Sequence, residues 1–477
     1  MTSIYSARWV LPIISPVIEN GAVAFEGSDI IAVGLRTEIV SRFPDSRMED
    51  FGQAAILPGF VNAHSHLELT VMRGFLEPEE SNFLAWLRKL TVARLAMTAE
   101  DLLVSATCGA IEAARAGVTC LGDASSAAEP GMKALQAVGL RGIVYQESFG
   151  PDPGVAAENV ANLREQISES RLLEDGMVRV GVSPHAPYSV SGPQLELISR
   201  LALDEQIPLM MHAAESQAEK LFLLAGRGPF AEALRARGIE WQAPGISTIQ
   251  YLKRHGILET RPLFAHCINV DDSDLDLIKQ SQAGIAHCPK SNAKLGHGRA
   301  LFAEFITRGL SVGLGSDSVA SNNTCDVLEE ARFATLLARL DQAGIATGTE
   351  DSDPDDDKRI GTLPDDSATA PVNAEQALYA ATLGGARAIG RDVQIGALAP
   401  GMQADITVVS LNGAHQQPVG DPAAALVFAS SGRDVLLTMV AGREIYRAGL
   451  ISAVNEVEFR ERLGHIRTKI DSLTDIS

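Results

Sequence analysis

Short apolar runs of β type alternate with helical stretches through the middle of the chain. Each run is rich in Val, Ile, Leu or Ala and is bounded by Gly, Pro or polar residues, which is typical of strands buried in a parallel sheet. Repeated βα units predict a (β/α)8 barrel of the TIM type, closing after a helix near Ala374 to Ala388. The eight predicted strands are Ile56 to Val61, Val118 to Gly122, Gly142 to Glu147, Val178 to Val182, Ile207 to Met211, Pro262 to Ala265, Ala283 to Ala286 and Ser311 to Gly315.

Both ends of the chain carry short β-rich runs of a second kind. Ala22 to Phe25 and Ile30 to Val33 near the start are separated by Gly-containing turns, and Ala404 to Val409 and Val435 to Tyr446 near the end have the same character. We expect the two ends to pair into one small discontinuous β-sandwich domain beside the α/β barrel. The predicted boundaries are 1–57 for its first part, 58–395 for the barrel, and 396–477 for its second part plus a C-terminal helix.

Two insertions interrupt the βα units. Phe75 to Thr98 follows the first predicted barrel strand as a long loop and helix, so it should lie at the mouth of the barrel. Gly344 to Ala370 contains the acidic run Glu350 to Asp357 together with Pro and Ser, which is typical of an exposed, mobile loop. A cation site is the alternative, but carboxylates this dense in sequence are more often solvated and apart.

The composition sets the class of protein and excludes some partners. With 477 residues and 46% hydrophobic residues, the chain can bury a large barrel core and a companion domain. A net charge of −20 repels polyphosphate chains, so we expect no nucleic-acid partner. The apolar segment from Tyr5 to Ile18 is broken by Arg8, Pro12 and Pro16, so no membrane partner is expected. The five cysteines form no Cys-x-x-Cys pair, which indicates buried thiols in a reducing, cytoplasmic compartment.

Four histidines and one aspartate stand where the predicted strands end. His64 and His66 end the first strand, His212 the fifth, His266 the sixth and Asp317 the eighth. Because alternate side chains of an extended strand share a face, His64 and His66 point to the same side. In parallel barrels the chemistry gathers at the carboxyl ends of the strands. A single histidine at a strand end is ordinary, but the whole set predicts a metal site.

Nitrogen and carboxylate ligands without thiolate suit one divalent ion, with Zn²⁺ favoured and iron as the alternative. Such an ion lowers the pKa of a bound water toward neutrality. Asp317 is expected to take the proton of that water, and Glu215, three residues after His212, to protonate the substrate and the leaving group. The alternative for Glu215 is an exposed position on a first helical turn. His266 is either a ligand or a group that positions the attacking water.

Several of these motifs together resemble the amidohydrolase superfamily, in the branch of cytosine, guanine and adenosine-type deaminases and triazine hydrolases. The resemblance implies that His64, His66, His212 and Asp317 bind one metal ion, that Glu215 moves protons, and that His266 orients water. The run from Gly396 to Asp405 resembles the return of such chains to their small β domain. The motifs are Pro58 to His66, the His212 and Glu215 pair, Ala265 to Cys267, His287 to Asn292, and Gly315 to Asp317.

The resemblance also bears on the number of ions and on the ribose. Binuclear relatives place a carboxylated lysine at the end of the fourth strand, but the run from Val178 to His185 contains no lysine, which indicates a single ion. His185 then faces the pocket and, as in nucleoside-deaminating relatives, hydrogen-bonds a ribose. The alternative is a loop histidine without a ligand.

Within this branch, the runs from His64 to Leu69, from Phe83 to Arg88 and from Gly139 to Glu147 resemble aminodeoxyfutalosine deaminases. Those enzymes hydrolyse the 6-amino group of an adenine nucleoside that bears a carboxyphenyl chain. Deaminases of methylthioadenosine and S-adenosylhomocysteine are the nearest alternatives. The candidate contacts to purine, ribose or carboxylate are Glu68, Arg88, Arg141 and Glu147, with Trp86 as an apolar platform.

Other functions stay open at this point. A guanine or cytosine deaminase, or hydrolysis of chloride or alkylamine from a triazine or of a cyclic amide, would use the same metal chemistry. A barrel that lost catalysis and serves as a structural protein is the non-enzyme alternative, although such proteins lose ligands and this set is complete. The expected partner is a small-molecule substrate, and a monomer and a homo-oligomer both stay open.

Overall fold

The computed structural model of the chain describes residues 1–342 and 370–474. The acidic insertion expected from Gly344 to Ala370 therefore lies outside the described residues, apart from Ala370 itself. The helix predicted near Ala374 to Ala388 is confirmed, as α15 (Ala374–Tyr379), a π-helical turn (Ala380–Gly384) and α16 (Gly385–Ala388).

Eight parallel strands form the centre of the fold, in two sheets of four. Nearly all of their side chains are buried, on both faces, and helices surround them, which explains the nearly unbroken apolar runs in the sequence. The first sheet contains β6 (Phe60–Ser65), β7 (Val118–Ser125), β8 (Arg141–Ser148) and β9 (Val178–Pro184); the second contains β10 (Met210–Ala213), β11 (Leu263–His266), β12 (Gly284–His287) and β13 (Ser311–Leu314).

The two sheets meet at both of their edges. Val182 of β9 forms a parallel bridge with Leu209 just before β10, and Ser65 of β6 forms one with Asp317 just after β13. At the second seam the Asp317 N–H donates to the carbonyl oxygen of His64 at 2.9 Å. These bridges bring the carboxyl ends of β6 and β13 together, and with them the first and last candidate ligands.

One predicted strand is wrong in extent. The run from Ile56 to Val61 spans the end of β5 (Ala54–Pro58) and the start of β6, which belong to different sheets. The chain changes sheet at Gly59, where a Cβ atom would lie 2.1 Å from the Thr119 side chain. Because both strands are fully buried, the hydrophobic pattern runs through the junction without a break.

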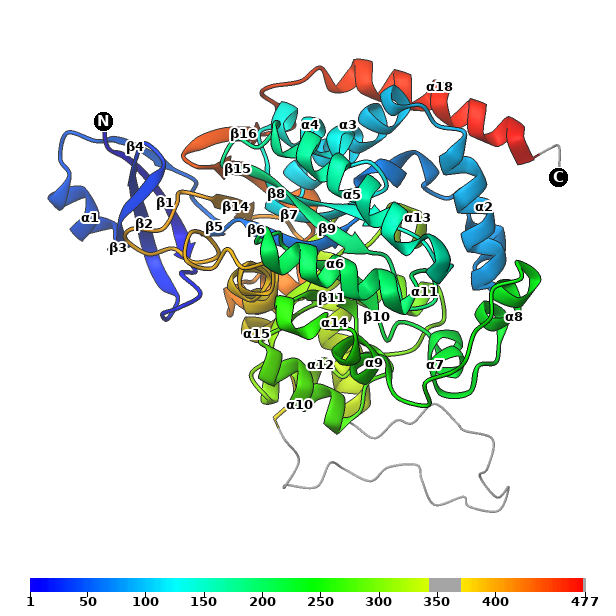
Figure 1. The fold of residues 1–477 in the computed structure, drawn as a ribbon. Coiled ribbons are helices and arrows are strands. Elements are labelled where there is room, and N and C mark those ends of the chain that lie inside the picture. Colours follow the sequence, from blue (N-terminus) through cyan, green and yellow to red (C-terminus); the bar gives the residue numbers. More distant parts are fainter. Residues whose placement is uncertain (343–369, 475–477) are drawn as a thin grey trace.

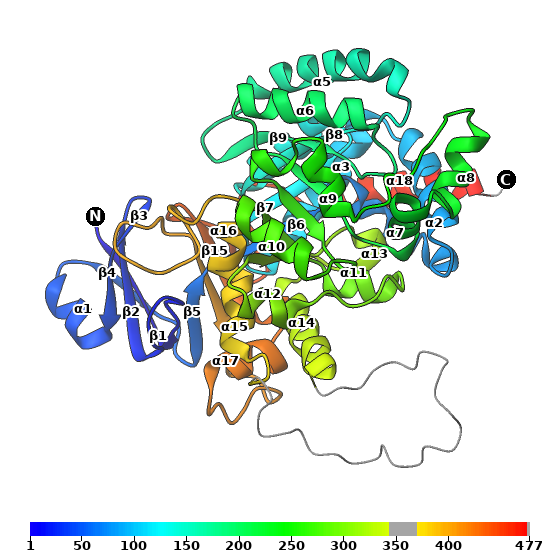
Figure 2. The ribbon, with the colours of Figure 1, turned by 60° about the horizontal axis from the view of Figure 1, so that its bottom comes forward.

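Helices pack around the parallel strands (Figures 1 and 2). Their apolar faces turn inward, as in α3, where Val104, Ala110 and Ile111 are buried. These helices are α2 (Phe83–Leu95), α3 (Ala99–Arg115), α4 (Ala128–Val138), α5 (Ala156–Arg171), α6 (Gly192–Asp204), α7 (Gln217–Ala225), α8 (Pro229–Ala236), α9 (Thr248–Arg254), α10 (Asp272–Ser281), α11 (Pro289–Lys294), α12 (Phe302–Thr307), α13 (Val319–Asn322) and α14 (Val327–Gln342).

The two chain ends pair directly, as the sequence pattern predicts. β14 lies between β5 and β15, with Ile56 opposite Val408. The pairing gives one continuous nine-stranded sheet, where we expected a sandwich of two sheets. The domain boundaries at 57 and 395 stay predictions. The strands are β1 (Ser3–Val10), β2 (Ile18–Glu26), β3 (Asp29–Leu35), β4 (Arg47–Asp50), β5, β14 (Ile406–Ser410), β15 (Val435–Val440), β16 (Arg443–Arg447) and β17 (Leu450–Ile451), with α1 (Arg36–Arg42) and α17 (Pro422–Ala424) between them in the chain.

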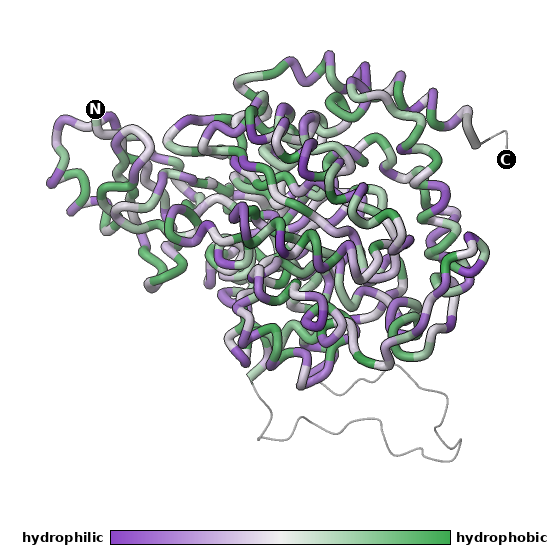
Figure 3. The backbone as a smooth tube through the Cα atoms, in the orientation of Figure 1, coloured by the Kyte–Doolittle hydropathy of each residue, from purple (hydrophilic) through white to green (hydrophobic). Residues whose placement is uncertain are grey.

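The C-terminal helix α18 (Glu456–Thr474) packs away from the small sheet. It lies along α3 and the short helix Leu67–Met72 that follows β6, and it buries Ile466 and Ile470 there (Figure 1). Hydrophilic and hydrophobic residues alternate along it (Figure 3). Among the described residues, no helix is both long enough and apolar enough to cross a membrane.

Candidate metal and catalytic site

A cavity of about 440 Å³ opens at the carboxyl ends of the parallel strands. Polar groups from the strand ends line one side, and α2 with its neighbours lines the other with apolar side chains. The insertion that contains α2 therefore lies at the mouth of the strands, as expected. The polar lining includes His66, Glu68, Arg94, Glu147, His185, His212, Glu215, His266 and Asp317, and the apolar lining includes Phe83, Trp86, Leu87, Leu90, Phe149, Tyr188 and Leu295.

Four of the predicted residues converge at the floor of this cavity. Ligand atoms of His64, His66, His212 and Asp317 all lie within 4.8 Å of one another. The Nε2 atoms of His66 and His212 are 3.2 Å apart, and Asp317 Oδ1 lies 3.3 Å from His64 Nε2 and 3.5 Å from His66 Nε2. Residues from the ends of three strands, β6, β10 and β13, thus aim one donor atom each at a common point.

The protonation states of this cluster fit a divalent metal ion. Burial, and after it the neighbouring His64, lowers the pKa of His66 to about 3, so its imidazole is neutral at pH 7. Burial also lowers the pKa of His212 well below its ordinary value. Burial alone would raise the pKa of Asp317, but the nearby histidines hold it well below its usual range. Neutral imidazoles and an ionised carboxylate are the forms that bind a metal.

Hydrogen bonds outside the cluster orient its donors. His212 Nδ1 lies 3.0 Å from the carbonyl oxygen of His185, which makes Nδ1 the donor and turns the Nε2 lone pair toward the cluster. The Oδ2 atom of Asp317 accepts from the hydroxyls of Ser291 at 2.5 Å and Ser321 at 2.9 Å, which leaves Oδ1 for the cluster. Neither ring nitrogen of the buried His64 has a hydrogen bond within the described chain. A cation would give one of these nitrogens a partner, so the residues fit one ion.

The backbone at these strand ends adopts conformations that non-glycine residues rarely take. Positive φ angles occur at Ala214 (53°), His266 (75°), Cys267 (48°) and Asp317 (56°). Each follows or ends one of the strands β10, β11 or β13. Such strain costs about 1–3 kcal/mol per residue and is typical of functional sites, where the surrounding structure holds it.

Glu215 and His266 form a pair of titratable side chains beside the four clustered residues. His266 Nε2 is 3.7 Å from Glu215 Oε1, and Asn292 Oδ1 accepts from His266 Nδ1 at 2.9 Å, which fixes the ring. Burial would raise the pKa of Glu215, but His266 and His297 outweigh it and the pKa is lowered. Glu215 is therefore buried yet ionised, the state that a general base needs. The exposed alternative for Glu215 is wrong.

Four of the predicted substrate contacts line the cavity: Glu68, Trp86, Glu147 and His185. The Glu68 carboxylate accepts from the hydroxyl of Ser125 at 2.8 Å and is fixed. Glu147 Oε1 is buried without a hydrogen bond in the described chain, and burial raises the pKa of Glu147 to about 8. His185 also faces the cavity, and burial lowers its pKa to about 4.

Two predicted contacts, Arg88 and Arg141, are wrong. Arg88 is exposed on the outer side of α2, because it follows the buried Trp86 by two residues and a helix turns about 200° over that interval. Arg141 begins β8 at the end away from the cavity and forms a buried ion pair with Asp405 at 2.8 Å. Neither side chain lines the cavity.

The sequence reasoning missed Arg94 and His297. Arg94 follows Trp86 by eight residues and so shares its face of α2, and this helical spacing was a usable signal. Its guanidinium lies 3.9 Å from Glu68 Oε1 and 5.6 Å from the centre of the Phe149 ring. His297 lies 3.4 Å from Glu215 across 82 residues of sequence, in a loop whose pattern carries no signal for that contact.

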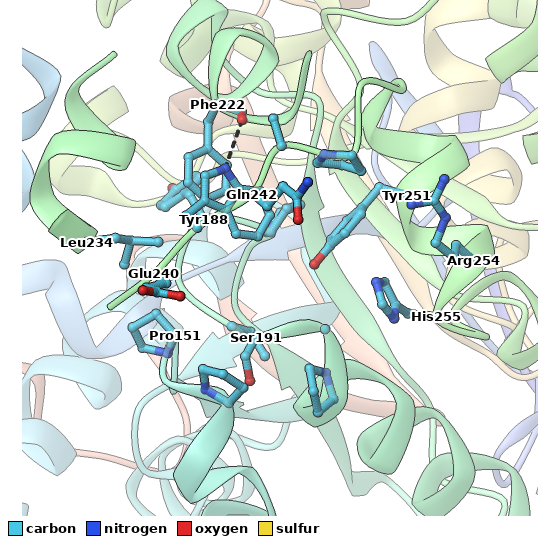
Figure 4. A pocket seen from close by; sticks show the side chains of 18 residues that line it. Pro151, Tyr188, Ser191, Phe222, Leu234, Glu240, Gln242, Tyr251, Arg254 and His255 are labelled. Carbon is cyan, nitrogen blue, oxygen red and sulfur yellow. Dashed lines mark hydrogen bonds between the residues drawn. The ribbon is translucent and has the colours of Figure 1, made fainter. Parts of the chain in front are cut away.

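Figure 4 shows the lining of a second cavity, which has a volume of about 460 Å³. Its walls are prolines and aromatic rings, including Trp241, which stacks on Phe222 at 4.1 Å and donates its indole N–H to the Phe222 carbonyl oxygen at 3.1 Å. Tyr188 lines both cavities. None of the clustered histidines or carboxylates lines the second cavity, so the chemistry belongs to the first.

The chain is similar in sequence and in structure to known proteins. Residues 55–445 match the model of the Amidohydrolase family. A protein of Nitratidesulfovibrio vulgaris (strain Miyazaki F) named 5-methylthioadenosine/S-adenosylhomocysteine deaminase is 31% identical over 91% of this chain and 89% of its own length. The structure of an adenosine deaminase from Xanthomonas campestris with bound zinc covers 98% of both chains at a TM-score of 0.82 and 25% identity.

The fold also extends to more distant structures. Atrazine chlorohydrolase from Arthrobacter aurescens TC1, in complex with zinc, superposes at a TM-score of 0.80 with 21% identity over 98% of this chain and 100% of that one. The resemblance to the branch of deaminases and triazine hydrolases is therefore confirmed. The chain belongs to the amidohydrolase family.

Proposed function

We propose that this chain is a metal-dependent hydrolase that removes the 6-amino group of an adenine nucleoside. The observation that carries the proposal is the convergence of His64, His66, His212 and Asp317 next to the ionised Glu215 and the oriented His266. The deaminase names of its relatives support hydrolysis of a carbon–nitrogen bond. We also propose that the two bridged sheets act as one (β/α)8 barrel that presents these residues at one rim.

The residues divide the reaction between them. The four clustered residues would hold one divalent ion, for which we propose zinc with iron as the alternative, and the bound ion supplies the Lewis acidity that makes water a nucleophile at neutral pH. Glu215 takes one proton from the attacking water and passes it to a ring nitrogen as oxygen bonds to C6. His266, fixed by Asn292, directs Nε2 at the developing charge. Asp317 passes the second water proton to the amino nitrogen, so that the carbon–nitrogen bond breaks and ammonia leaves.

The apolar wall of the cavity and Arg94 would contact the group attached to the 5′ carbon of the nucleoside. Phe83, Trp86 and Leu90 offer an apolar surface on α2, and Arg94 adds a guanidinium to the same face. The Nε atom of Arg94 is buried and has no hydrogen bond within the described chain. A carboxylate at the end of an apolar chain would satisfy it. We therefore keep aminodeoxyfutalosine as the first candidate, with Arg94 in the role predicted for Arg88.

A second candidate is the substrate class of the relatives, 5′-methylthioadenosine and S-adenosylhomocysteine. S-adenosylhomocysteine carries a carboxylate that Arg94 can bind, whereas methylthioadenosine carries none. Both have apolar thioether chains that fit the wall of α2. Both candidate classes would undergo the same reaction at C6. They differ in the 5′ chain, which carries an aromatic ring only in aminodeoxyfutalosine.

The test is a side-by-side assay of ammonia release by the zinc-loaded protein. The panel contains aminodeoxyfutalosine, S-adenosylhomocysteine, methylthioadenosine, adenosine, guanine, cytosine and a chlorotriazine. We expect an adenine nucleoside with a carboxylate on its 5′ chain to have the highest kcat/KM. If guanine, cytosine or the triazine is turned over best, the nucleoside proposal is wrong.

A further inference from the structure

The loop after α11 brings a histidine to the Glu215 carboxylate. His297 Nδ1 lies 3.4 Å from Glu215 Oε1, and the two side chains are only 5% and 7% exposed. The glycines on either side, Gly296 and Gly298, have φ angles of 68° and 109°, which residues with a Cβ rarely adopt. The loop thus turns sharply enough to direct the His297 ring inward.

No hydrogen bond of the ring within the described chain explains the burial of His297. Neither ring nitrogen makes a hydrogen bond of ordinary geometry within the described chain. The Phe83 ring packs edge-on against it at 4.5 Å, and His297 itself does not line the cavity. Burying an imidazole without a hydrogen-bond partner costs free energy. The position of His297 next to Glu215 therefore requires an explanation. Catalytic hydrogen bonds are often long in a free enzyme and shorten when substrate binds.

The same segment fixes two further groups of the site. Ser291 donates its hydroxyl to Asp317, and Asn292 accepts from the His266 ring. His297, in the loop that follows this helix, lies close to a third group of the site, Glu215. One short helix and its loop thus contact the ligand, the water-positioning group and the proton-transfer group of the proposed reaction.

We propose that His297 is a positioning residue for Glu215, an inference that rests on the function proposed above. His266 Nε2 and His297 Nδ1 both lie close to the same carboxylate oxygen, Oε1, at 3.7 Å and 3.4 Å. The other carboxylate oxygen, Oε2, is then left to take and release the proton. His297 acts through Glu215 and does not touch the substrate.

The test compares two substitutions of His297 on the best substrate of the panel. His297→Phe keeps the ring packed against Phe83 and removes the N–H, and it should lower kcat about 10- to 100-fold with little change in KM. His297→Asn places an amide N–H near the position of Nδ1 and should restore most of kcat. Metal content should stay at the wild-type level in both. His415→Asn, which changes an exposed histidine bonded to Asp434, is the matched control and should leave kcat unchanged.

A double-mutant comparison guards against a purely structural effect. In a Glu215→Gln background, His297→Asn and His297→Phe should cause no further loss, because the group they position is gone. Wild-type kcat in His297→Phe, equal losses in both single variants, or an undiminished loss in the Glu215→Gln background would each overturn the inference. Failure of the proposed function is seen separately, because the wild type would then prefer a panel member that is not an adenine nucleoside.

Discussion

Glu215 combines two properties that rarely occur together, since it is buried and yet ionised. His266 and His297, at 3.7 Å and 3.4 Å from its Oε1 atom, outweigh the effect of burial and hold its pKa low. The carboxylate is therefore poised to exchange protons at the wall of the cavity. Its role can be separated from metal binding, because it lies outside the cluster of four ligands.

Glu215→Gln should retain the metal and lose most turnover. The amide keeps the size of the side chain but cannot take a proton, and removal of an acid–base group typically costs about 10²- to 10⁴-fold in rate. The measurement is kcat together with metal content by elemental analysis. Near-normal turnover in this variant would remove Glu215 from the mechanism.

Arg94→Met should lower kcat/KM for a carboxylate-bearing nucleoside about 10-fold or more relative to methylthioadenosine, because a charged hydrogen bond is worth about 1.5–3 kcal/mol. Arg88→Met on the same helix is the matched control, since Arg88 is exposed and should leave both values unchanged. Equal losses for both nucleosides in Arg94→Met would show that Arg94 only balances the charge of Glu68 and Glu147.

Burial of His287 makes the free energy of unfolding depend on pH, independently of catalysis. Burial lowers the pKa of this histidine from 6.5 to about 3, so the folded protein stays neutral there while the unfolded chain takes up a proton below pH 6.5. Stability from this group is present above pH 6.5 and falls as the pH drops toward 3. Between pH 7.5 and 5.0 the wild type should lose about 2 kcal/mol more than His287→Phe, whose ring can stack on Phe302 in the same way. Urea unfolding at the two pH values measures this, and parallel losses would contradict the assignment.

The sequence predicted the residues of the four-residue cluster better than the residues that line the cavity, for a physical reason. His64, His66, His212 and Asp317 are fixed by strand ends, and the carboxyl ends of parallel strands meet at one rim whatever the details of packing. Arg88 and Arg94 lie on one helix, and only its rotation about its axis decides which of them faces the cavity. His297 depends on the path of a single loop, which no periodicity encodes.

At the scale of elements, the apolar pattern predicted strands but not the sheets to which they belong. β5 and β6 form one unbroken apolar run, yet β5 pairs with β1 and β14 while β6 pairs with β7. The change of sheet at Gly59 is a tertiary event, set by close packing against Thr119. In the same way, the ion pair of Arg141 could not be seen without knowing that β8 and β14 lie near each other.

Arg141 joins the parallel strands to the small sheet through Asp405, and both side chains are at least 94% buried. Arg141→Met leaves an unpaired buried carboxylate and should lower the free energy of unfolding by about 3–5 kcal/mol. The value of kcat should stay near that of the wild type, because Arg141 lies outside the cavity. Adding Asp405→Asn should recover part of the stability. A large loss of kcat with unchanged urea midpoint would restore Arg141 as a substrate contact.

At the scale of the whole molecule, the geometry favours a single metal ion. Glu147 and His185 form a second possible ligand group, but only by sharing His212. The Nδ1 atom of His212 is engaged by the His185 carbonyl oxygen, so one nitrogen remains and serves one ion. Two tightly held ions per chain in elemental analysis would show that this reading is wrong.

The most direct measurement of the central claim is deamination of S-adenosylhomocysteine and aminodeoxyfutalosine by the same preparation before and after metal removal. The loss of the 6-amino group is followed by absorbance and by ammonia release. We predict turnover by protein with about one zinc per chain, loss of turnover after chelation, and recovery on adding one equivalent of zinc. Full turnover by metal-free protein, or no turnover of any adenine nucleoside by the zinc-loaded protein, would contradict the account.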